Sequence, residues 1–433
     1  MPRWTDRIRS GRGALPLFLG LGGVQAGLWI AGLPPGVGAG GFGWRALVLF
    51  GLQLVSVWLV WNRNDRGVIA TILVLTVVFR IAAWTWPPDL SSDLYRYVWD
   101  GRVQMAGHGP YDAPPADESL AHLRDSEIWP HINRPEAVTV YPPGGELTFL
   151  ALAAAGVHTV DGVKAAAVAV ELVAVLLLLL VLRERRLPAG RIALYAWCPL
   201  VISEVAVSGH LDALVLPLMV GALWLAGRRA PVAAGGLVGA AALLKVYPLL
   251  LLAAVPPGGR VRAAAAAAGV VLAGYALYLP RAGARVLGFL PEYVRSGEDF
   301  NLGLRGFLQN ALGTVSDSGR PVAMVICGVL LAIAVLVVAS RKDRDAFRSA
   351  RSIALAFVLL VPTAVHPWYA AWMVPLLVVH PSASGVWLAG LLPLSYAKYG
   401  TVTDEMPAAV HLLVWLPAFL FLLVDRARWR GDT

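Results

Sequence analysis

Three residues with the potential for acid–base chemistry follow the third apolar segment of the chain. Pro87-Pro88 ends that segment, and Ser91-Ser92 offers a cap for a new helix. Asp93, Tyr97 and Asp100 then have the spacing i, i+4 and i+7, which places them on one face of that helix. A carboxylate beside aromatic rings at a membrane boundary can act as a general base or hold a cation. The competing interpretation is a helix-capping carboxylate among solvated charges.

A lysine in an apolar run is the second chemical signal. Lys245 lies within Ala240–Pro248, where an ammonium group is costly to bury and needs a partner, either a lipid phosphate or a carboxylate. Snorkelling to the membrane interface is the alternative. His210 and Asp212 fall where two apolar segments meet, and Arg305, in a later polar stretch, offers a contact to phosphate.

The remaining polar stretches contain prolines and aromatic residues, a composition typical of ordered binding loops. They are Gly107–Tyr111, Trp129–Asn133, Tyr141–Pro143 and His366–Tyr369. No histidine or cysteine spacing in the first three fits a structural zinc site. The two cysteines of the chain lie separately in apolar stretches, as helix filler rather than a pair. Walker, GxSxG and HExxH motifs are absent in a fitting context, which argues against ATP-driven transport and against serine or zinc hydrolysis.

The elements that position these residues are membrane-spanning helices. Of the 433 residues, 58% are hydrophobic and 15% are charged, and the mean hydropathy is +0.66, which leaves too little polar surface for a soluble domain of this size. A spanning helix needs about 20 mostly apolar residues, and such segments recur from Ala14 to Val424. We therefore expect a single membrane-embedded domain over residues 1–433, all-α and polytopic.

The basic clusters orient these segments, because Lys and Arg concentrate on the cytoplasmic side of membrane proteins. Placing every cluster in the cytoplasm, together with both termini, gives one consistent threading with about 12–14 spans. It leaves a long ordered outer loop at 87–161, with short interfacial helices, and a second outer loop at 281–320. The net charge of +9 is spread over the clusters, which favours topology signals and anionic membrane lipids over a nucleic-acid partner. The expected spans lie near 14–33, 44–61, 67–86, 163–182, 191–207, 212–227, 263–280, 321–340, 352–366, 368–380, 384–396 and 408–424.

Two apolar stretches do not fit as simple spans. Residues 146–160 are best interpreted as a short interfacial or re-entrant helix, since a full span there would place Arg183–Arg186 outside. Lys245 and Pro248 interrupt 231–256, which we interpret as two short helices. With this threading the candidate residues gather at outer helix ends, so we expect the chemistry on the non-cytoplasmic face.

The order of these motifs resembles the GT-C superfamily of membrane glycosyltransferases. The resemblance is to the bacterial group around glycosyltransferase family 87 and to the polyprenol-phosphate-mannose-dependent mannosyltransferases. It extends over roughly residues 87–370, most of the chain. The stretches that carry it are Ser92–Tyr97, Trp99–Arg102, Gly109–Tyr111, Tyr141–Pro143, Gly209–Leu214, Leu244–Pro248 and His366–Tyr369.

The resemblance implies a GT-C-like fold and an inverting transfer of a hexose, with mannose the family-weighted choice, from a polyprenyl-phosphate donor to a glycan or lipid acceptor of the cell envelope. Asp93 matches the catalytic carboxylate of the family, and Asp100 would be a second carboxylate. Lys245, supported by Arg305, would neutralise the leaving phosphate. The implied substrate-binding residues are Tyr97, Arg102, Tyr141, His210, Asp212, His366 and Tyr369.

Three further expectations concern the cofactor, the region that recognises the acceptor and the cellular location. It does not decide whether a divalent cation takes part, and it names no other cofactor. Many members of the superfamily carry a separate soluble C-terminal domain, whereas this chain ends at its last apolar segment, so we expect the loops to recognise the acceptor. Richness in Gly, Ala and Arg suggests a high-GC genome and hence a bacterial inner (plasma) membrane.

Other classes of function compete with the transferase interpretation. A transporter or lipid-linked-sugar flippase would use Asp93, Lys245 and His366 as substrate or proton sites, but it favours inverted repeats, and the sequence shows no convincing internal repeat. A membrane scaffold would have no use for a lysine in an apolar run or for a long ordered loop. Among enzymes, a polymer ligase with a lipid-pyrophosphate donor is the nearest rival.

Overall fold

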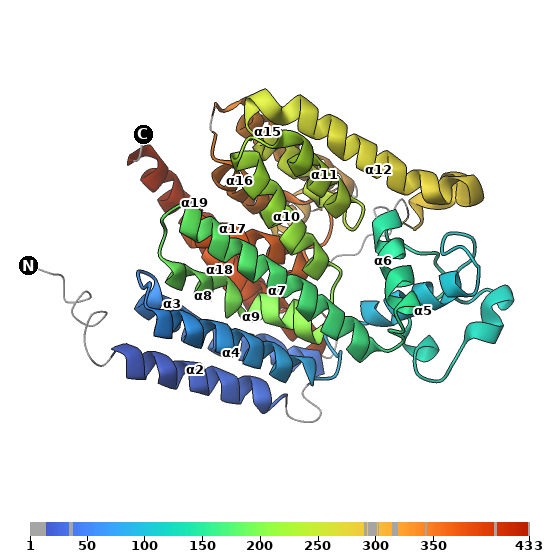
Figure 1. Cartoon of the computed structure of the whole chain (residues 1–433), viewed down its shortest axis with the longest axis horizontal. Coiled ribbons are helices and arrows are strands. Elements are labelled where there is room, and N and C mark those ends of the chain that lie inside the picture. Colours follow the sequence, from blue (N-terminus) through green and yellow to red (C-terminus); the bar gives the residue numbers. More distant parts are fainter. Residues whose placement is uncertain are drawn as a thin grey trace, which may run out of the picture. The chain divides into compact units, whose positions relative to one another are not determined.

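The computed structural model describes residues 14–33, 38–289, 292, 301, 303–313, 319–342, 344–401 and 405–431, without the side chains of residues 427–431. Within these ranges every regular element is a helix and no β-strand occurs (Figure 1). The all-α class expected from the sequence is therefore confirmed. The second outer loop expected at 281–320 lies only partly within the described residues.

The chain divides into two compact units. The first consists of Met1–Leu90, Val175–Val207 and His366–Thr433, and the second of Ser91–Ala174 and Ser208–Val365. The long helix α7 (Val160–Glu184) contributes its first part to the second unit and its last part to the first. The residues singled out for chemistry therefore fall mostly in the second unit.

The first unit is built from long apolar helices followed by shorter helices that proline interrupts. Besides the end of α7, its elements are α2 (Ala14–Ile30), α3 (Gly38–Val60), α4 (Arg66–Trp84), η3 (Ala189–Ile192), α8 (Ala193–Ala196), α9 (Pro199–Ile202), the π-helical turn η4 (Ser203–Val207), η8 (Pro367–Met373), α17 (Val374–Val379), α18 (Ala383–Leu391), η9 (Leu392–Gly400) and α19 (Ala408–Gly431). Helix α4 ends just before the double proline, as the sequence predicts.

One expected span of this unit, near 191–207, is broken rather than continuous. The two halves, Ala189–Ala196 and Pro199–Val207, meet at 55°, because Pro199 has no N–H to continue the ladder. Backbone carbonyls freed at such a break need other donors when no water is available. Gln53 on α3 donates to the Leu194 carbonyl at 2.8 Å, and buried Arg80 on α4 donates to the Ala196 carbonyl at 2.9 Å.

The second unit combines residues 91–161 of the polar loop expected on the outer side of the membrane with a group of apolar helices. The loop carries α5 (Asp93–Met105), η1 (Glu118–Leu123), η2 (Trp129–His131) and α6 (Pro143–Ala154). The apolar group, besides the start of α7, comprises α10 (Asp212–Gly227), α11 (Pro231–Ala242), η5 (Tyr247–Ala254), η6 (Pro257–Gly259), α12 (Arg260–Ala282), η7 (Gly283–Leu287), α14 (Gly303–Gly313), α15 (Gly319–Ser340) and α16 (Ala346–Leu360). The short helix expected at 146–160 is α6, and the interruption expected at Lys245 separates α11 from η5.

Small residues let α11 and α12 pack with their backbones close together. A Cβ atom at Gly235 would overlap the Ala263 carbonyl, and one at Gly239 would lie 2.7 Å from the Ala267 carbonyl. Glycines four residues apart form one flat strip on a helix, which is how membrane helices approach closely. This contact keeps α11 in place just before the chain reaches Lys245.

We expect Gly235→Ala to destabilise the protein by about 1–3 kcal/mol through overpacking. Gly236→Ala is the matched control, since a Cβ there has no atom within 4 Å and gains the same helix propensity. Both free cysteines, Cys198 and Cys327, are buried, so a thiol-reactive dye can follow thermal unfolding in detergent. Equal unfolding temperatures for the two variants would contradict the close contact.

Six helices of the described residues are long and apolar enough to cross a membrane, namely α3, α4, α7, α12, α15 and α19. The broken pair makes seven if counted as one span. Four shorter apolar helical segments accompany them: α2, α10, α11 and Pro367–Val379. The polytopic class is confirmed. Within the described residues, helices of full spanning length are fewer than the 12–14 spans expected, because prolines break several apolar stretches into shorter helices.

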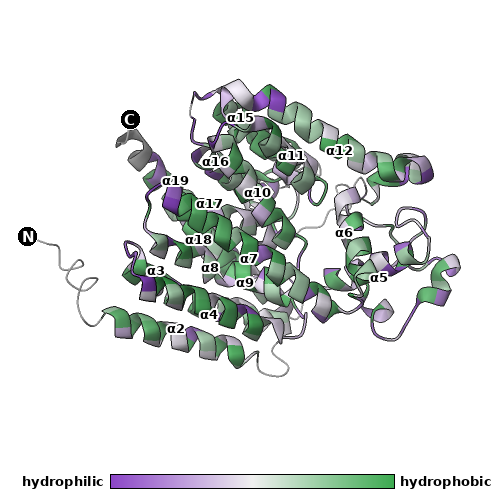
Figure 2. Ribbon diagram, in the orientation of Figure 1, coloured by the Kyte–Doolittle hydropathy of each residue, from purple (hydrophilic) through white to green (hydrophobic). Residues whose placement is uncertain are grey.

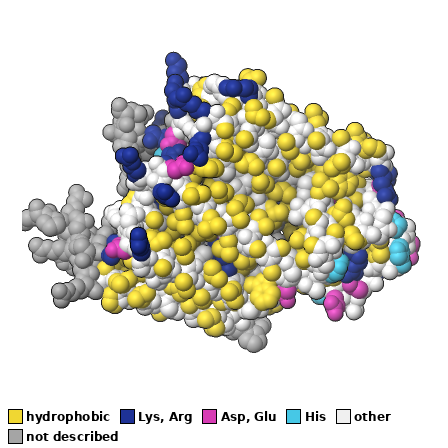
Figure 3. All heavy atoms as spheres, in the orientation of Figure 1, with side chains coloured by type: hydrophobic (Ala, Val, Ile, Leu, Met, Phe, Trp, Pro, Cys, Tyr) yellow, Lys and Arg dark blue, Asp and Glu magenta, His cyan; other side chains and the backbone are white. Residues whose placement is uncertain are grey.

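The helix surfaces confirm that lipid, rather than protein, must cover part of the molecule. Figure 2 shows hydrophobic residues along the whole length of most apolar helices, and Figure 3 shows hydrophobic side chains over much of the displayed face. In the most apolar window of α12, and likewise of α15, only 17% is buried inside the protein. Exposed apolar surface on this scale needs an apolar solvent.

Candidate active site

Helix α5 presents Asp93 as its first residue, as the sequence predicts. The Ser91 hydroxyl accepts a hydrogen bond from the Asp93 amide at 3.2 Å, whereas Ser92, in the capping position, makes no side-chain cap bond. A carboxylate in the first turn is stabilised by the helix dipole. The helix rests on α6 at Gly101, where a Cβ would lie 2.6 Å from the Phe149 carbonyl. Backbone-to-backbone packing at Gly101 therefore holds α5 against α6.

The Asp93 carboxylate is partly exposed and surrounded by groups that favour its charged form. Asn133 donates to its Oδ1 at 2.9 Å, and the Tyr141 hydroxyl also hydrogen-bonds to it. Burial raises the pKa of Asp93, but attraction to His210 and Lys245 and these hydrogen bonds outweigh that effect and hold the pKa below its usual value. Asp93 is therefore ionised at neutral pH and available as a proton acceptor.

Two buried tyrosines line the inner side of the carboxylate. Tyr97 stacks on Phe149 at 4.6 Å between ring centroids, and Tyr141 meets Tyr97 edge-on at 5.2 Å. The Tyr97 hydroxyl accepts a hydrogen bond from the Leu211 amide at 3.4 Å. Burial, together with the Asp93 charge, raises the pKa of both tyrosines well above the usual value, so both remain protonated donors.

Lys245 has one of the two kinds of partner that its apolar surroundings predict, a carboxylate. Its Nζ lies 3.4 Å from Oδ2 of Asp212 and 5.6 Å from the centroid of the Tyr141 ring. The Tyr247 hydroxyl donates to the other Asp212 oxygen at 2.8 Å. The Asp212 side chain is 3% exposed and that of Lys245 17% exposed, so the ammonium group is the accessible member of the pair. The break between α11 and η5 places Lys245 there.

His210 lies on a sharp turn just before α10. Gly209 has φ +55°, and a Cβ there would lie 2.6 Å from Leu94, so the turn requires glycine. His210 is buried and interacts electrostatically with Asp93, Asp212 and Lys245. Burial, outweighing the attraction of the carboxylates, lowers the pKa of His210 to about 4. At neutral pH the imidazole is therefore neutral, and Lys245 supplies the positive charge beside Asp93.

Asp100 is buried and ion-paired within the outer loop. Arg96, one turn earlier on α5, donates from Nε to Oδ1 at 2.8 Å and to Oδ2 at 2.9 Å, and from Nη1 to the Ala137 carbonyl at 2.9 Å. Asp100 is 1% exposed. Helical spacing thus places Asp93, Tyr97 and Asp100 on the loop's inner side, but only Asp93 reaches an accessible surface.

The remaining predicted residues occupy other places. Arg102 pairs with Asp125 at 2.6 Å within the outer loop. Arg305 is buried on α14, near Cys327. His366 and Tyr369 belong to the first unit, where the buried His366 ring stacks on Trp368 at 4.3 Å. Their roles in substrate binding stay predictions.

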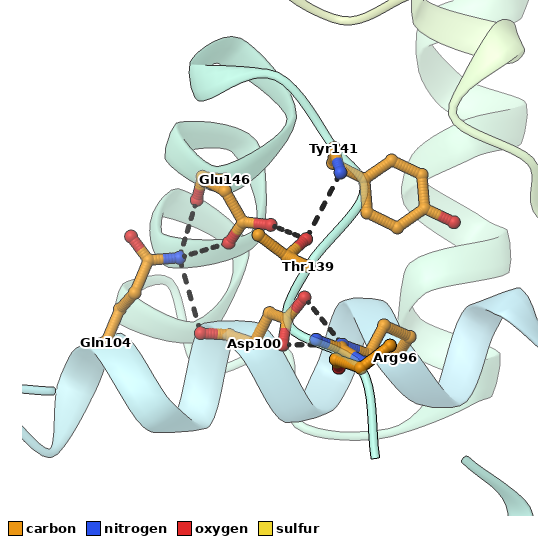
Figure 4. Close-up of polar contacts among 7 residues, drawn as sticks. Arg96, Asp100, Gln104, Thr139, Tyr141 and Glu146 are labelled. Carbon is orange, nitrogen blue, oxygen red and sulfur yellow. Dashed lines mark hydrogen bonds and ion pairs between the residues drawn. The ribbon is translucent and has the colours of Figure 1, made fainter. Parts of the chain in front are cut away.

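The structure adds polar residues that sequence reasoning did not select, chiefly Asn133, Gln104 and Glu146. Gln104 Nε2 donates to Glu146 Oε2 at 2.9 Å, and the Thr139 hydroxyl donates to Glu146 Oε1 at 2.6 Å (Figure 4). The signal for Glu146 was available, because an acid opening an apolar stretch is costly to bury without partners. Asn133 had no such signal, since loop residues meet a distant helix only after folding.

The described residues contain no group of three or more His, Cys, Asp and Glu side chains that could hold a metal ion. Around Asp93 the second carboxylate, Asp212, is occupied by Lys245 and Tyr247. Around Asp93 the part of the chain that the structure describes therefore forms no cage for a divalent cation.

The fold and the site define a polytopic helical membrane protein with an ionised carboxylate, a neutral imidazole and a lysine–aspartate pair at helix ends. The family model for glycosyltransferase family 87 matches residues 139–364, just over half of the chain, and the chain belongs to this family. The matched range includes Tyr141, His210, Asp212 and Lys245, and Asp93 precedes it. Neither a curated protein nor a solved structure matches the chain.

Proposed function

We propose that this glycosyltransferase moves a sugar, mannose in the first instance, from a polyprenyl-phosphate donor to a hydroxyl group of a glycan or lipid acceptor. The transfer takes place on the non-cytoplasmic face of the bacterial inner membrane, with both termini in the cytoplasm. The observation that carries the proposal is an ionised, accessible Asp93 beside the Lys245–Asp212 pair in a family 87 chain.

In the proposed reaction Asp93 is the general base. The acceptor oxygen forms a bond to the anomeric carbon while the bond from that carbon to the phosphate oxygen breaks, and the acceptor proton passes to Asp93. A single displacement of this kind inverts the anomeric configuration. Asn133 and Tyr141 donate to the carboxylate and orient it. The exposed side of Asn133 is where the acceptor approaches.

Lys245 stabilises the leaving phosphate in this proposal. Negative charge builds on the phosphate oxygen as the glycosidic bond breaks, and a preorganised cation there lowers the barrier. Asp212 and the Tyr141 ring fix the ammonium group in advance. Asp100 acts indirectly, by holding Arg96, while Arg305 as a second phosphate contact, and Arg102, His366 and Tyr369 as substrate contacts, complete the proposed set.

Transfer of label tests the proposal directly. Purified protein in nanodiscs is incubated with radiolabelled polyprenyl-phosphate mannose and an acceptor extract, and label is followed into acceptor. Transfer by the wild type supports the proposal. No transfer with mannose, glucose or arabinose on the same carrier would contradict it, and accumulation of the intact donor across a proteoliposome membrane would instead support a flippase.

The pH dependence of transfer should report the low pKa of His210. The neutral form of His210 persists down to about pH 4, so activity should not decline near 6.5, the usual pKa of histidine. Because the pKa of His210 is lower in the folded protein than in the unfolded chain, the folding stability is highest above pH 6.5. It decreases as the pH falls from 6.5 towards 4. The check is kcat/KM from pH 8 downwards for wild type and His210→Gln; an acid limb near 6.5 that the variant lacks would contradict it.

A further inference from the structure

The outer loop contains a buried acid, Glu146, that the proposed mechanism does not use. We infer that Glu146 is a positioning residue, which fixes the backbone at Tyr141 through Thr139 and so holds the Tyr141 hydroxyl against Asp93. The inference rests on the proposed function where activity is the readout. Its structural part, that Glu146 orders the segment around Tyr141, stands independently.

The Thr139 hydroxyl connects Glu146 to the backbone at Tyr141. Thr139 Oγ1 donates to Glu146 Oε1 at 2.6 Å and accepts a hydrogen bond from the Tyr141 amide at 3.2 Å (Figure 4). Thr139 and Glu146 are both fully buried, so water cannot replace either bond. Removing the acceptor at Glu146 therefore releases the hydroxyl that fixes the Tyr141 backbone.

The second carboxyl oxygen of Glu146 is also held by a hydrogen bond. Its Oε2 accepts from Gln104 on α5 at 2.9 Å, and Gln104 Oε1 accepts from the Tyr278 hydroxyl of α12 at 2.8 Å. The Tyr111 hydroxyl adds a second hold on the same backbone by donating to the Tyr141 carbonyl at 2.8 Å. Glu146 thus joins α5, α6 and α12 to the short segment that carries Tyr141.

The charge state of the Glu146 carboxyl group is compatible with its role as a positioning residue. The titratable groups that face Glu146 are Arg96 and Asp100 from α5, Tyr111 from the loop and Tyr278 from α12. Arg96 is already neutralised by Asp100. Burial and the Asp100 charge raise the pKa of Glu146 well above its usual value, which favours the protonated, neutral form of the acid.

An amide has nearly the same size and shape as a neutral carboxylic acid but does not transfer a proton. A glutamine variant therefore distinguishes a positioning role of Glu146 from acid–base chemistry. In Glu146→Gln the amide oxygen still accepts from Thr139 and the NH2 group can donate to Asp100, while the bond that Oε2 accepts from Gln104 is lost. In Glu146→Ala all of these contacts are lost. Thr139→Val removes only the bridging hydroxyl, and Thr148→Val, which removes a hydroxyl bonded to the Gly144 carbonyl on the same helix α6, is the matched control.

The experiment combines hydrogen exchange with kinetics. Glu146→Ala and Thr139→Val should speed deuterium uptake in a peptide covering residues 137–145 and lower kcat about tenfold or more, with KM changed less. Thr148→Val should change neither, and Glu146→Gln should restore most of what Ala loses. Unchanged exchange in Thr139→Val, or a Gln variant as poor as Ala, would overturn the inference. If the wild type transfers no sugar, the proposed function fails while the exchange comparison still decides the positioning role.

Discussion

Replacing Asp93 with asparagine should lower the rate of sugar transfer by about a thousandfold, the contribution typical of a general base. Asparagine keeps the size of the side chain and retains one oxygen that can still accept the hydrogen bond from Asn133. The fold and donor binding should therefore survive, and the loss should appear in kcat rather than KM. Initial rates with labelled polyprenyl-phosphate sugar, at saturating and limiting donor, measure both.

A neighbouring acid provides the control for this substitution. Asp117 lies in the same outer loop, is exposed, and accepts from the Ser119 amide at 2.9 Å at the start of η1. Asn can cap that turn as Asp does, so Asp117→Asn should transfer at the wild-type rate. Near-normal transfer by Asp93→Asn would show that another group accepts the proton.

The features that local sequence determines were predicted well. The start of α5 at Asp93 follows from a proline pair and two serines, and the break at Lys245 follows from a charge and a proline in an apolar run. That Lys245 has an anionic partner follows from the cost of burying a lone ammonium group, although burial did not decide between a phosphate and the carboxylate that the structure shows. Each inference depends on residues a few positions apart or on solvation alone.

Features that depend on long-range contacts were not predicted. Helical spacing predicted that Asp93 and Asp100 share one face of α5. It could not show that Arg96 forms an ion pair with Asp100 or that Asn133 donates a hydrogen bond to Asp93. Hydropathy treats Glu146 as one polar residue in an apolar stretch, and its hydrogen-bond partners come from α5 and from the segment at Thr139. Spacing along one helix says nothing of what the neighbouring element contributes.

The described residues contain fewer full-length apolar helices than the 12–14 spans expected, for a related reason. Hydropathy measures how apolar a segment is, whereas crossing a membrane also needs an unbroken helix of about 20 residues. The segment over Ala189–Val207 is apolar enough, but it bends by 55° at its proline. It stays buried because Gln53 and Arg80, distant in sequence, bind the carbonyls that the break frees.

Lys245→Met should lower transfer about a hundredfold, as expected when one cationic contact to a developing oxyanion is lost, and should also raise KM for the donor. The substitution has a second consequence, because Asp212 is 3% exposed and would lose its countercharge. An unpaired buried carboxylate costs about 3 kcal/mol. The single variant would therefore be slow and unstable together, and its lost activity alone would not identify the role of the ammonium group.

The double variant Lys245→Met/Asp212→Asn separates these effects. Asparagine removes the buried charge and still accepts the Tyr247 hydroxyl bond, so the unfolding temperature should return close to that of the wild type. Transfer should stay about a hundredfold low, because no cation faces the leaving phosphate. Lys245→Arg should recover part of the rate through its own charge. If the double variant regained both stability and transfer, the ammonium group would serve only to neutralise Asp212, and the phosphate would have to be stabilised by another group.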